Sequence, residues 1–278
     1  MTTTKTPPCI GDFPDQVSQE EREFVRSEGF LQFGRLLHDS DLFPLRFAFE
    51  RFWEANPIDP DAHGKGAMPG HRALSMEHFI DEPDIMRLMA NEYFLRIASA
   101  ALDRSPEELE YAGGYVNRQR CQEAWLYGDS NWNGWHQDAQ PTDEPLCHLN
   151  IWIYLDDYSR LDGVTQVLLG GCDQQRENRL KGCHENDGIG EMWAEQDSLD
   201  TGVYAEGPAG GGFAWGGFVF HRITPNRTGR PRRLVTWEYR HKSVCESEGS
   251  IFREKTTTEQ RAALADLLPE DKRFLVTF

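Results

Sequence analysis

The segment 148–155 constrains the fold most strongly, because two kinds of side chain alternate along it without interruption. Side chains of a β-strand alternate between its two faces, so the pattern predicts one aliphatic face and one polar-aromatic face. The aliphatic residues are Leu149, Ile151, Ile153 and Leu155, and the others are His148, Asn150, Trp152 and Tyr154. Such a strand is typical of a barrel or sandwich whose second face lines a pocket.

Helices are predicted for the N-terminal third. A capping box at Ser18 starts a first helix, which Gly29 ends, and apolar residues at helical spacing over 42–55 indicate a second. Pro83 lies in the first turn of a third helix, and a start signal at Ser105 opens another short one. The Pro-, Gly- and His-rich segment 56–76 is predicted to be a long loop.

Strands dominate from residue 111 onward, and Gly and Pro separate them. Besides 148–155, the segments with strand character are 111–117, 122–127, 164–169, 212–221 and 233–240. We therefore expect a mainly β fold with flanking helices, an antiparallel barrel or sandwich covered on one side. One domain is expected over residues 1–278. It has a mainly helical part at about 18–110, a β core at about 111–243 and a C-terminal extension at 244–278.

Charge and cysteine usage narrow the class of protein. The chain has 29 Lys and Arg against 46 Asp and Glu, a net charge of −17, which disfavours nucleic acid as a partner. It has no apolar run of about 18 residues that would predict a membrane span. A secretory signal is not visible, and none of the six scattered cysteines forms a C-x-x-C pair. We expect a cytoplasmic protein that acts on a small molecule, in an oligomeric state that the sequence leaves open.

Three residues predict a metal centre. In His136-Gln137-Asp138, the imidazole and the carboxylate lie on one side of an extended segment and can share a metal ion. His221, at the end of an apolar Gly-rich strand, would complete a two-His-one-carboxylate triad, which is typical of non-haem Fe(II) oxygenases. Taken singly, a His-x-Asp is more often a surface pair, and a strand-end histidine more often a core residue.

The segment 225–233 is rich in arginine and follows this histidine. Arg232 lies eleven residues after His221, so a turn and a returning strand would bring it back beside the histidine. A guanidinium there can bind a carboxylate through two parallel hydrogen bonds. Arg227 and Arg230 are interpreted as parts of a solvated basic turn.

These motifs together resemble the phytanoyl-CoA dioxygenase-like (PhyH) branch of the Fe(II)/2-oxoglutarate-dependent oxygenases. The resemblance rests on His136-Gln137-Asp138, on the Gly-rich strand that ends in Phe220-His221, and on the Pro-Asn-Arg…Pro-Arg segment that ends at Arg232. It extends to the N-terminal SQEEREFVRSEGFLQFGRLL, which is similar to that branch's opening helix and first strand, and to Trp152-Ile153-Tyr154-Leu155-Asp156-Asp157.

The resemblance implies a double-stranded β-helix, a jelly-roll of cupin type, with flanking helices. His136, Asp138 and His221 would hold Fe(II), and Arg232 would bind the distal carboxylate of 2-oxoglutarate. The resemblance also places Trp152, Asn150 and Gln119 at positions that would lie near this cosubstrate. The implied enzyme is a dioxygenase, an oxidoreductase that uses Fe(II), 2-oxoglutarate and O2. It would oxidise an aliphatic C–H of a small metabolite or natural-product intermediate and release succinate and CO2. Hydroxylation is the expected outcome, and ring formation, desaturation and epoxidation are the alternatives. The carboxylate of Asp138 disfavours halogenation.

The substrate is less well defined than the reaction. Trp132, Trp135 and Trp215 would join Trp152 as walls that keep the metal dry, and ordinary aromatic packing is the other interpretation. His71 and Arg72 lie in the predicted long loop and are candidate substrate contacts. A small amine, which can stack on aromatic faces, and a natural-product intermediate both fit. A coenzyme A thioester is disfavoured because basic residues are few outside the region of Arg232.

Two other classes of function remain open at the sequence level. A zinc hydrolase would use the same three ligands with an activated water in the open position, and would leave Arg232 without a role. A non-catalytic barrel would bind a metal ion or a carboxylate without turnover.

Overall fold

The computed structural model describes residues 7–56, 71–119, 146–169, 202–217, 219, 221–224 and 226–278, with only the backbone at 71–74 and 119. Its helices are α1 (Gln19–Glu28), α2 (Asp39–Ala55), α3 (Pro83–Met86), α4 (Glu92–Leu102), α7 (Lys242–Glu248), α8 (Ile251–Lys255) and α9 (Thr258–Leu267). Its 3₁₀ helices are η1 (Met76–His78), η2 (Arg87–Ala90), η3 (Pro106–Glu108) and η5 (Glu270–Leu275). Its strands are β1 (Cys9–Ile10), β2 (Phe30–Phe33), β3 (His71–Ser75), β4 (Leu109–Gly113), β5 (Tyr115–Gln119), β6 (His148–Tyr154), β7 (Thr165–Val167), β8 (Val203–Tyr204), β9 (Gly212–Trp215), β10 (His221–Ile223) and β11 (Arg232–His241).

The first helix begins and ends where its capping residues predict. Ser18 closes a capping box with Glu21, and Gly29 ends α1 in the left-handed conformation, with φ of 71°. A further helix, α4, was not predicted as a separate element. It begins after Asn91, whose side chain accepts hydrogen bonds from two backbone N–H groups. The helix predicted near Pro83 is therefore followed by a separate one: α3 and η2 end before Asn91, and α4 begins after it.

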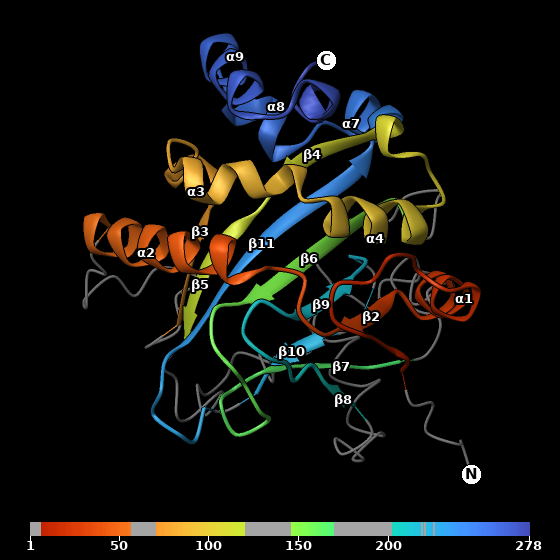
Figure 1. The fold of residues 1–278 in the computed structure, drawn as a ribbon, viewed down its shortest axis with the longest axis vertical. Coiled ribbons are helices and arrows are strands. Elements are labelled where there is room, and N and C mark those ends of the chain that lie inside the picture. The colour runs from red at the N-terminus through yellow and green to blue at the C-terminus, as the bar shows by residue number, and fades with distance from the viewer. Residues whose placement is uncertain are drawn as a thin grey trace, which may run out of the picture.

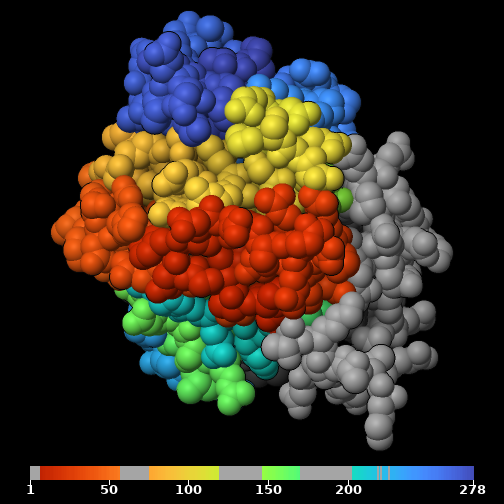
Figure 2. Space-filling view, turned by 45° about the vertical axis from the view of Figure 1, so that its right-hand side comes forward, coloured from red at the N-terminus to blue at the C-terminus, as the bar shows by residue number. Residues whose placement is uncertain are grey.

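Eight strands form the larger sheet, in the order β1-β2-β9-β6-β11-β5-β3, with β4 also paired to β11. In Figure 1, α2, α3 and α4 lie over one face of this sheet, and α7, α8 and α9 lie at its upper end. Figure 2 shows the N-terminal segment and the segment around residue 100 covering that side. The fold is mainly β with flanking helices, as the sequence predicts.

The two faces of β6 differ as the alternation predicts. Leu149, Ile151, Ile153 and Leu155 belong to the large apolar core beneath the helices. Trp152 and Tyr154 belong to a second, smaller and mainly aromatic core on the opposite face. The apolar side of the sheet therefore fixes the helical layer, and the aromatic side is available to line a site.

Three predicted segments have different boundaries in the structure. The predicted strand 111–117 is two strands, β4 and β5, which both pair with β11, with a register shift in β11 between Glu238 and Tyr239. Gly114 lies between them, where the backbone O of Thr236, 2.2 Å from an ideal Cβ position, leaves no room for a side chain. The predicted strand 212–221 is also two strands. β9 ends at Trp215 in the larger sheet, and β10 begins at His221 in a three-stranded sheet with β7 and β8. The end of the predicted loop 56–76 is a strand, since β3 pairs with β5. The predicted strand 122–127 lies outside the described residues.

The smaller sheet, in the order β10-β7-β8, lies away from the helices in Figure 1. The chain crosses from the larger sheet to the smaller one through Gly216, whose N–H donates to the carbonyl of Gly29 at 2.8 Å. This crossing brings the end of β9 close to the start of β10. Within the described ranges, no helix is both long and apolar enough to cross a membrane.

Candidate active site

Strand pairing aligns three of the sequence-predicted residues in one row. Arg232, at the start of β11, pairs with Gln119 at the end of β5, and Gln119 pairs with His71 at the start of β3. Arg72 occupies the next register position. It pairs with Arg118, whose guanidinium lies 5.9 Å from the ring of Trp53 in the helical layer. His71 and Arg72 are thus strand residues, and only His71 shares the row of Arg232.

The Arg232 side chain is completely buried and is held by a phenol. Its guanidinium hydrogen-bonds to the hydroxyl of Tyr154, which donates in turn to the carbonyl of Ala205 at 2.5 Å. Burial lowers the pKa of Arg232, and the phenols of Tyr154 and Tyr158 partly oppose this, but a guanidinium stays protonated in proteins. Burial also raises the pKa of Tyr154, so this phenol is neutral. The result is a fixed cation with the geometry to bind a carboxylate in bidentate fashion.

Several buried polar atoms near this arginine have no hydrogen-bond partner in the part of the chain that the structure describes. They are Nε1 of Trp152, Nε1 of Trp215, Oδ1 of Asn150 and Oγ1 of Thr165. Asn150 pairs with Trp215 in the sheet register, and the rings of Trp152 and Trp215 are 4.8 Å apart. A buried polar atom without a partner is costly, so natural proteins keep few of them. Those of Trp152, Trp215 and Asn150 lie on one face of the larger sheet, which indicates a place where a polar ligand binds.

His221 faces this group from the smaller sheet. It is 4% exposed, and its ring centroid lies 3.6 Å from that of Trp215. Its Nδ1 lies 2.9 Å from the carbonyl oxygen of Val219. A carbonyl only accepts, so Nδ1 carries the proton and Nε2 carries the lone pair. Metal-binding histidines are commonly oriented by such a hydrogen bond from the other ring nitrogen.

The remaining predicted residues lie outside the described residues. These are His136, Asp138, Trp132 and Trp135. Within the described ranges, no three His, Cys, Asp or Glu side chains come close enough to hold a metal ion. The metal triad therefore stays a prediction.

Two further side chains near the site were not singled out in the sequence. Tyr154 contacts Arg232, and the alternation along 148–155 could have identified it, because it follows Trp152 by two residues on the same face. Thr165 is completely buried on β7, where Ile223 pairs with it. This pairing joins segments far apart in the chain, so no local pattern indicates it.

A comparison with protein families decides the class of this protein. The family model described as phytanoyl-CoA dioxygenase (PhyH) matches residues 25–234, which include the described site. The chain belongs to the PhyH family. The expected 2-oxoglutarate-dependent dioxygenase, with Fe(II), 2-oxoglutarate and O2 as cofactors, is confirmed by this membership. Neither the zinc hydrolase nor the non-catalytic barrel is favoured.

Solved structures support the same fold for this PhyH-family chain. EvdO2 from Micromonospora carbonacea var. aurantiaca aligns with a TM-score of 0.57 at 23% identity, over 83% of this chain and 93% of its own. The carbocyclase SnoK from nogalamycin biosynthesis aligns with a TM-score of 0.61 at 17% identity, over 81% and 84%. The epimerase SnoN from the same biosynthesis aligns with a TM-score of 0.56 at 15% identity, over 79% and 81%. EvdO2 has been crystallised with 2-oxoglutarate, and SnoN with Fe3+ and α-ketoglutarate. No curated protein sequence matches the chain.

Proposed function

We propose that this protein couples the oxidative decarboxylation of 2-oxoglutarate to hydroxylation of an aliphatic C–H in a small metabolite or natural-product intermediate. One observation carries the proposal. Buried polar atoms of Trp152, Trp215 and Asn150 lack partners among the described residues, on the sheet face that also holds Arg232. A cosubstrate bound there would satisfy them, because 2-oxoglutarate offers several oxygen acceptors and brings ordered water with it.

His136, Asp138 and His221 would hold the iron, which when bound supplies the redox chemistry for O2. His221 would bind through Nε2, because its Nδ1 donates to the carbonyl of Val219. The Trp215 ring packs on the His221 ring and restricts its rotation. Within the described residues, this chain thus orients one ligand with a backbone acceptor and an aromatic wall.

Arg232 would bind the distal carboxylate of 2-oxoglutarate, with Tyr154 fixing the guanidinium. The indole N–H groups of Trp152 and Trp215 are donors only, so they suit oxygens of the cosubstrate. Oδ1 of Asn150 is an acceptor and suits a water or a substrate hydroxyl instead. Gln119 shares the row of Arg232 in the strand register.

A dry pocket would protect the reaction from bulk water. Phe213, Trp152 and Trp215 pack together, with ring centroids between 4.8 and 5.5 Å apart, and each is at most 6% exposed. Trp132 and Trp135 would extend this wall, and His71 and Arg72 would contact the substrate near its rim. The two sheets would be the halves of a double-stranded β-helix within a single domain, and the alignment with the solved structures at TM-scores of 0.56 to 0.61 supports a shared fold.

Ring closure or epimerisation is the second candidate for the outcome at the substrate. The carbocyclase SnoK and the epimerase SnoN share the fold, so hydroxylation is one of several outcomes that this scaffold supports. Both work in nogalamycin biosynthesis, which favours a natural-product intermediate as the substrate class here.

Succinate release by the iron-loaded protein tests the reaction and its ligands together. We expect the wild type to form succinate from 2-oxoglutarate slowly without substrate, and His136→Ala and His221→Ala to lose at least about a hundredfold of this rate. His78→Ala is the matched control. This histidine lies beside Ser75 on η1, and its loss should leave the rate unchanged. Full succinate release by His221→Ala, with iron retained, would refute the ligand assignment.

A further inference from the structure

The outward face of α2 exposes two phenylalanines that lie one turn apart. Phe43 is 52% exposed and Phe47 is 74% exposed. The other exposed large apolar side chains of the described ranges, Leu161, Leu267 and Phe278, lie on other segments of the chain. Residues four apart on a helix are neighbours on one face, so the two rings form one apolar patch. We propose that a second copy of this chain docks on this patch.

The opposite face of α2 already anchors the helix in the protein. Leu42, Leu45 and Phe49 belong to the large apolar core and are at most 2% exposed. Figure 2 shows the residues around 50, in orange, at the surface of the molecule. The guanidinium carbon of Arg46 lies 5.9 Å from the centroid of the Phe43 ring, and this ring is still half exposed. Folding therefore buries one side of this helix and leaves the aromatic pair largely in water.

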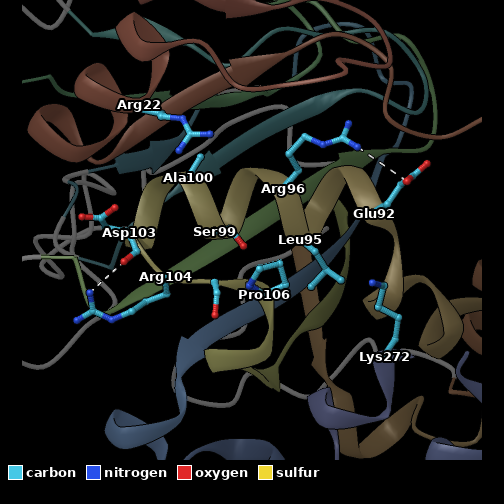
Figure 3. A pocket seen from close by; sticks show the side chains of 11 residues that line it. Arg22, Glu92, Leu95, Arg96, Ser99, Ala100, Asp103, Arg104, Pro106 and Lys272 are labelled. Atoms are coloured by element: carbon cyan, nitrogen blue, oxygen red, sulfur yellow. Dashed lines mark hydrogen bonds and ion pairs between the residues drawn. The ribbon is translucent and has the colours of Figure 1, made fainter. Parts of the chain in front are cut away.

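The helix α4 shows the more usual composition of an exposed helical row. Glu92 and Arg96 also lie one turn apart, and Oε2 of Glu92 is 3.9 Å from Nη2 of Arg96 (Figure 3). Charged side chains in such a row stay hydrated, and an opposite pair four residues apart stabilises the helix slightly. Two phenylalanines in the same arrangement leave apolar area in water, which is unfavourable. The patch on α2 therefore favours a partner that covers it.

The charges at the two ends of the patch identify this partner as a second copy. Asp39 lies one turn before the patch and Arg51 one turn after it, so one row at four-residue spacing runs from an anion through two rings to a cation. A copy related by a two-fold axis beside position 45 presents this row in reverse order. Asp39 of one copy then faces Arg51 of the other, and each Phe43 faces a Phe47. Rows at this spacing pack side by side in the commonest class of helix contact.

Both end charges are accessible to a second partner. The side chain of Asp39 is 62% exposed, although Nη2 of Arg35 lies 2.5 Å from its carboxylate. The side chain of Arg51 is 54% exposed and pairs with Glu82. These internal partners orient the two charged groups, so an antiparallel copy would extend each pair into a network across the interface. Exposed ion pairs contribute little affinity, so the charges set the register and the phenylalanines supply most of the attraction.

The size of the face predicts a weak dimer. α2 has 17 residues and is therefore about 25 Å long. A contact along one helix of this length lies at the low end of specific interface areas, which is typical of transient complexes. We expect a dimer in rapid exchange with the monomer, with a Kd of about 10–100 μM.

Sedimentation velocity of the full chain, from about 5 to 500 μM, tests self-association. The sedimentation coefficient of the wild type should rise with concentration toward that of a dimer. Phe43→Ser/Phe47→Ser should dimerise at least about 30-fold more weakly, because burying each aromatic ring accounts for roughly tenfold in affinity. Leu161→Ser/Leu267→Ser is the matched control. It removes two exposed apolar side chains elsewhere and should dimerise as the wild type does.

Two charge-reversal variants test the antiparallel register. Asp39→Arg and Arg51→Asp should each dimerise about tenfold more weakly than the wild type, because like charges then meet at both ends of the interface. An equimolar mixture of the two variants should regain the affinity of the wild type, since both contacts of the mixed dimer join opposite charges.

Three results would overturn the proposal. They are a wild type that remains monomeric at about 500 μM, a Phe43→Ser/Phe47→Ser variant that dimerises as tightly as the wild type, and a mixture of charge-reversal variants no tighter than its components. The first result would leave the patch on α2 to a different protein. Urea unfolding of every variant confirms that it is folded, which the buried inner face of α2 leads us to expect.

Discussion

The larger sheet carries tryptophan and tyrosine on both faces, and the two faces leave their polar atoms in different states. On the helical face, Nε1 of Trp237 donates to the carbonyl of Ile85 at 3.2 Å, and the hydroxyl of Tyr239 donates to that of Met89 at 2.8 Å. On the other face, Nε1 of Trp152 and Nε1 of Trp215 find no acceptor within the described ranges.

Burial alone does not explain this contrast, because Trp237 and Trp215 are both completely buried. Helices supply carbonyl acceptors to the first face, whereas the second face turns toward the smaller sheet. Tyr111 is the exception on the helical side, with a buried hydroxyl that lacks a partner among the described residues. The comparison suggests that one face completes its own hydrogen bonds and that the other completes them with ligands.

The largest effect is expected from removing the guanidinium of Arg232, on the sheet face that also carries Trp152 and Trp215. Arg232→Gln should weaken 2-oxoglutarate binding by at least about 30-fold, because removing one member of a buried charge pair costs about 2 kcal/mol or more. Equilibrium dialysis with labelled 2-oxoglutarate measures this, and Arg104→Gln is the control. Unchanged affinity in a folded Arg232→Gln protein would remove this arginine from the site.

Matched tryptophan substitutions compare the faces directly. Trp237→Phe should reduce the free energy of unfolding by about 1–3 kcal/mol, because it leaves the carbonyl of Ile85 without its donor. Trp152→Phe removes an N–H without a described acceptor and should cost less than about 1 kcal/mol. Urea unfolding measures both, and added 2-oxoglutarate should stabilise Trp237→Phe more than Trp152→Phe. Equal losses of stability would contradict the contrast.

A second matched pair uses tyrosine. Tyr154→Phe should weaken 2-oxoglutarate binding by about fivefold, because the phenol that orients Arg232 is lost. Tyr239→Phe should reduce stability by about 1 kcal/mol and leave this affinity unchanged. Dialysis and urea unfolding on the two variants give both quantities. If Tyr239→Phe changed the affinity more than Tyr154→Phe, the division between the faces would be wrong.

The smallest effect concerns Asp162, which anchors the connection from His221 to Arg232 through a bridge to Asn226. Burial raises the pKa of Asp162, but hydrogen bonds from Ser159, Thr228 and Arg230 outweigh it and lower the pKa overall. A lowered pKa stabilises the folded state above the unfolded value of about 3.9, and this contribution is lost as pH falls through the folded pKa. Asp162→Asn should therefore cost about 1 kcal/mol at neutral pH.

Urea unfolding across pH measures this contribution. The difference between Asp162→Asn and the wild type should be constant near neutral pH and shrink below pH of about 3.9. A difference that grew on acidification would contradict the sign.

Local patterns predicted the parts of the fold that depend on local chemistry. The cap at Ser18 and the alternation around Trp152 were confirmed, because each depends on neighbouring residues in one element. The crossing between Trp215 and His221 was not predicted, since the apolar run continues through it and only strand pairing ends β9. β3 was missed for the same reason, because its pairing with β5 is a long-range contact.

Within the site, sequence spacing predicted the placement of Arg232 at the start of a strand. The row that Arg232 forms with Gln119 and His71 was not predicted, because it depends on the register of the paired strands. The proximity of Trp215 to His221 could not be predicted, because it depends on how two sheets meet. The metal triad and the cytoplasmic location stay predictions.

We propose that the sheet face that carries Trp152, Trp215 and Arg232 binds iron and 2-oxoglutarate together. Anaerobic titration of metal-free protein with Fe(II) and then 2-oxoglutarate tests it, with the visible charge-transfer band of the chelate as the signal. We expect the band to appear with the wild type and with Trp237→Phe, and to be weaker in Arg232→Ala and in Trp152→Phe. Iron binding without the band in the wild type, or a band of full strength in Arg232→Ala, would contradict it.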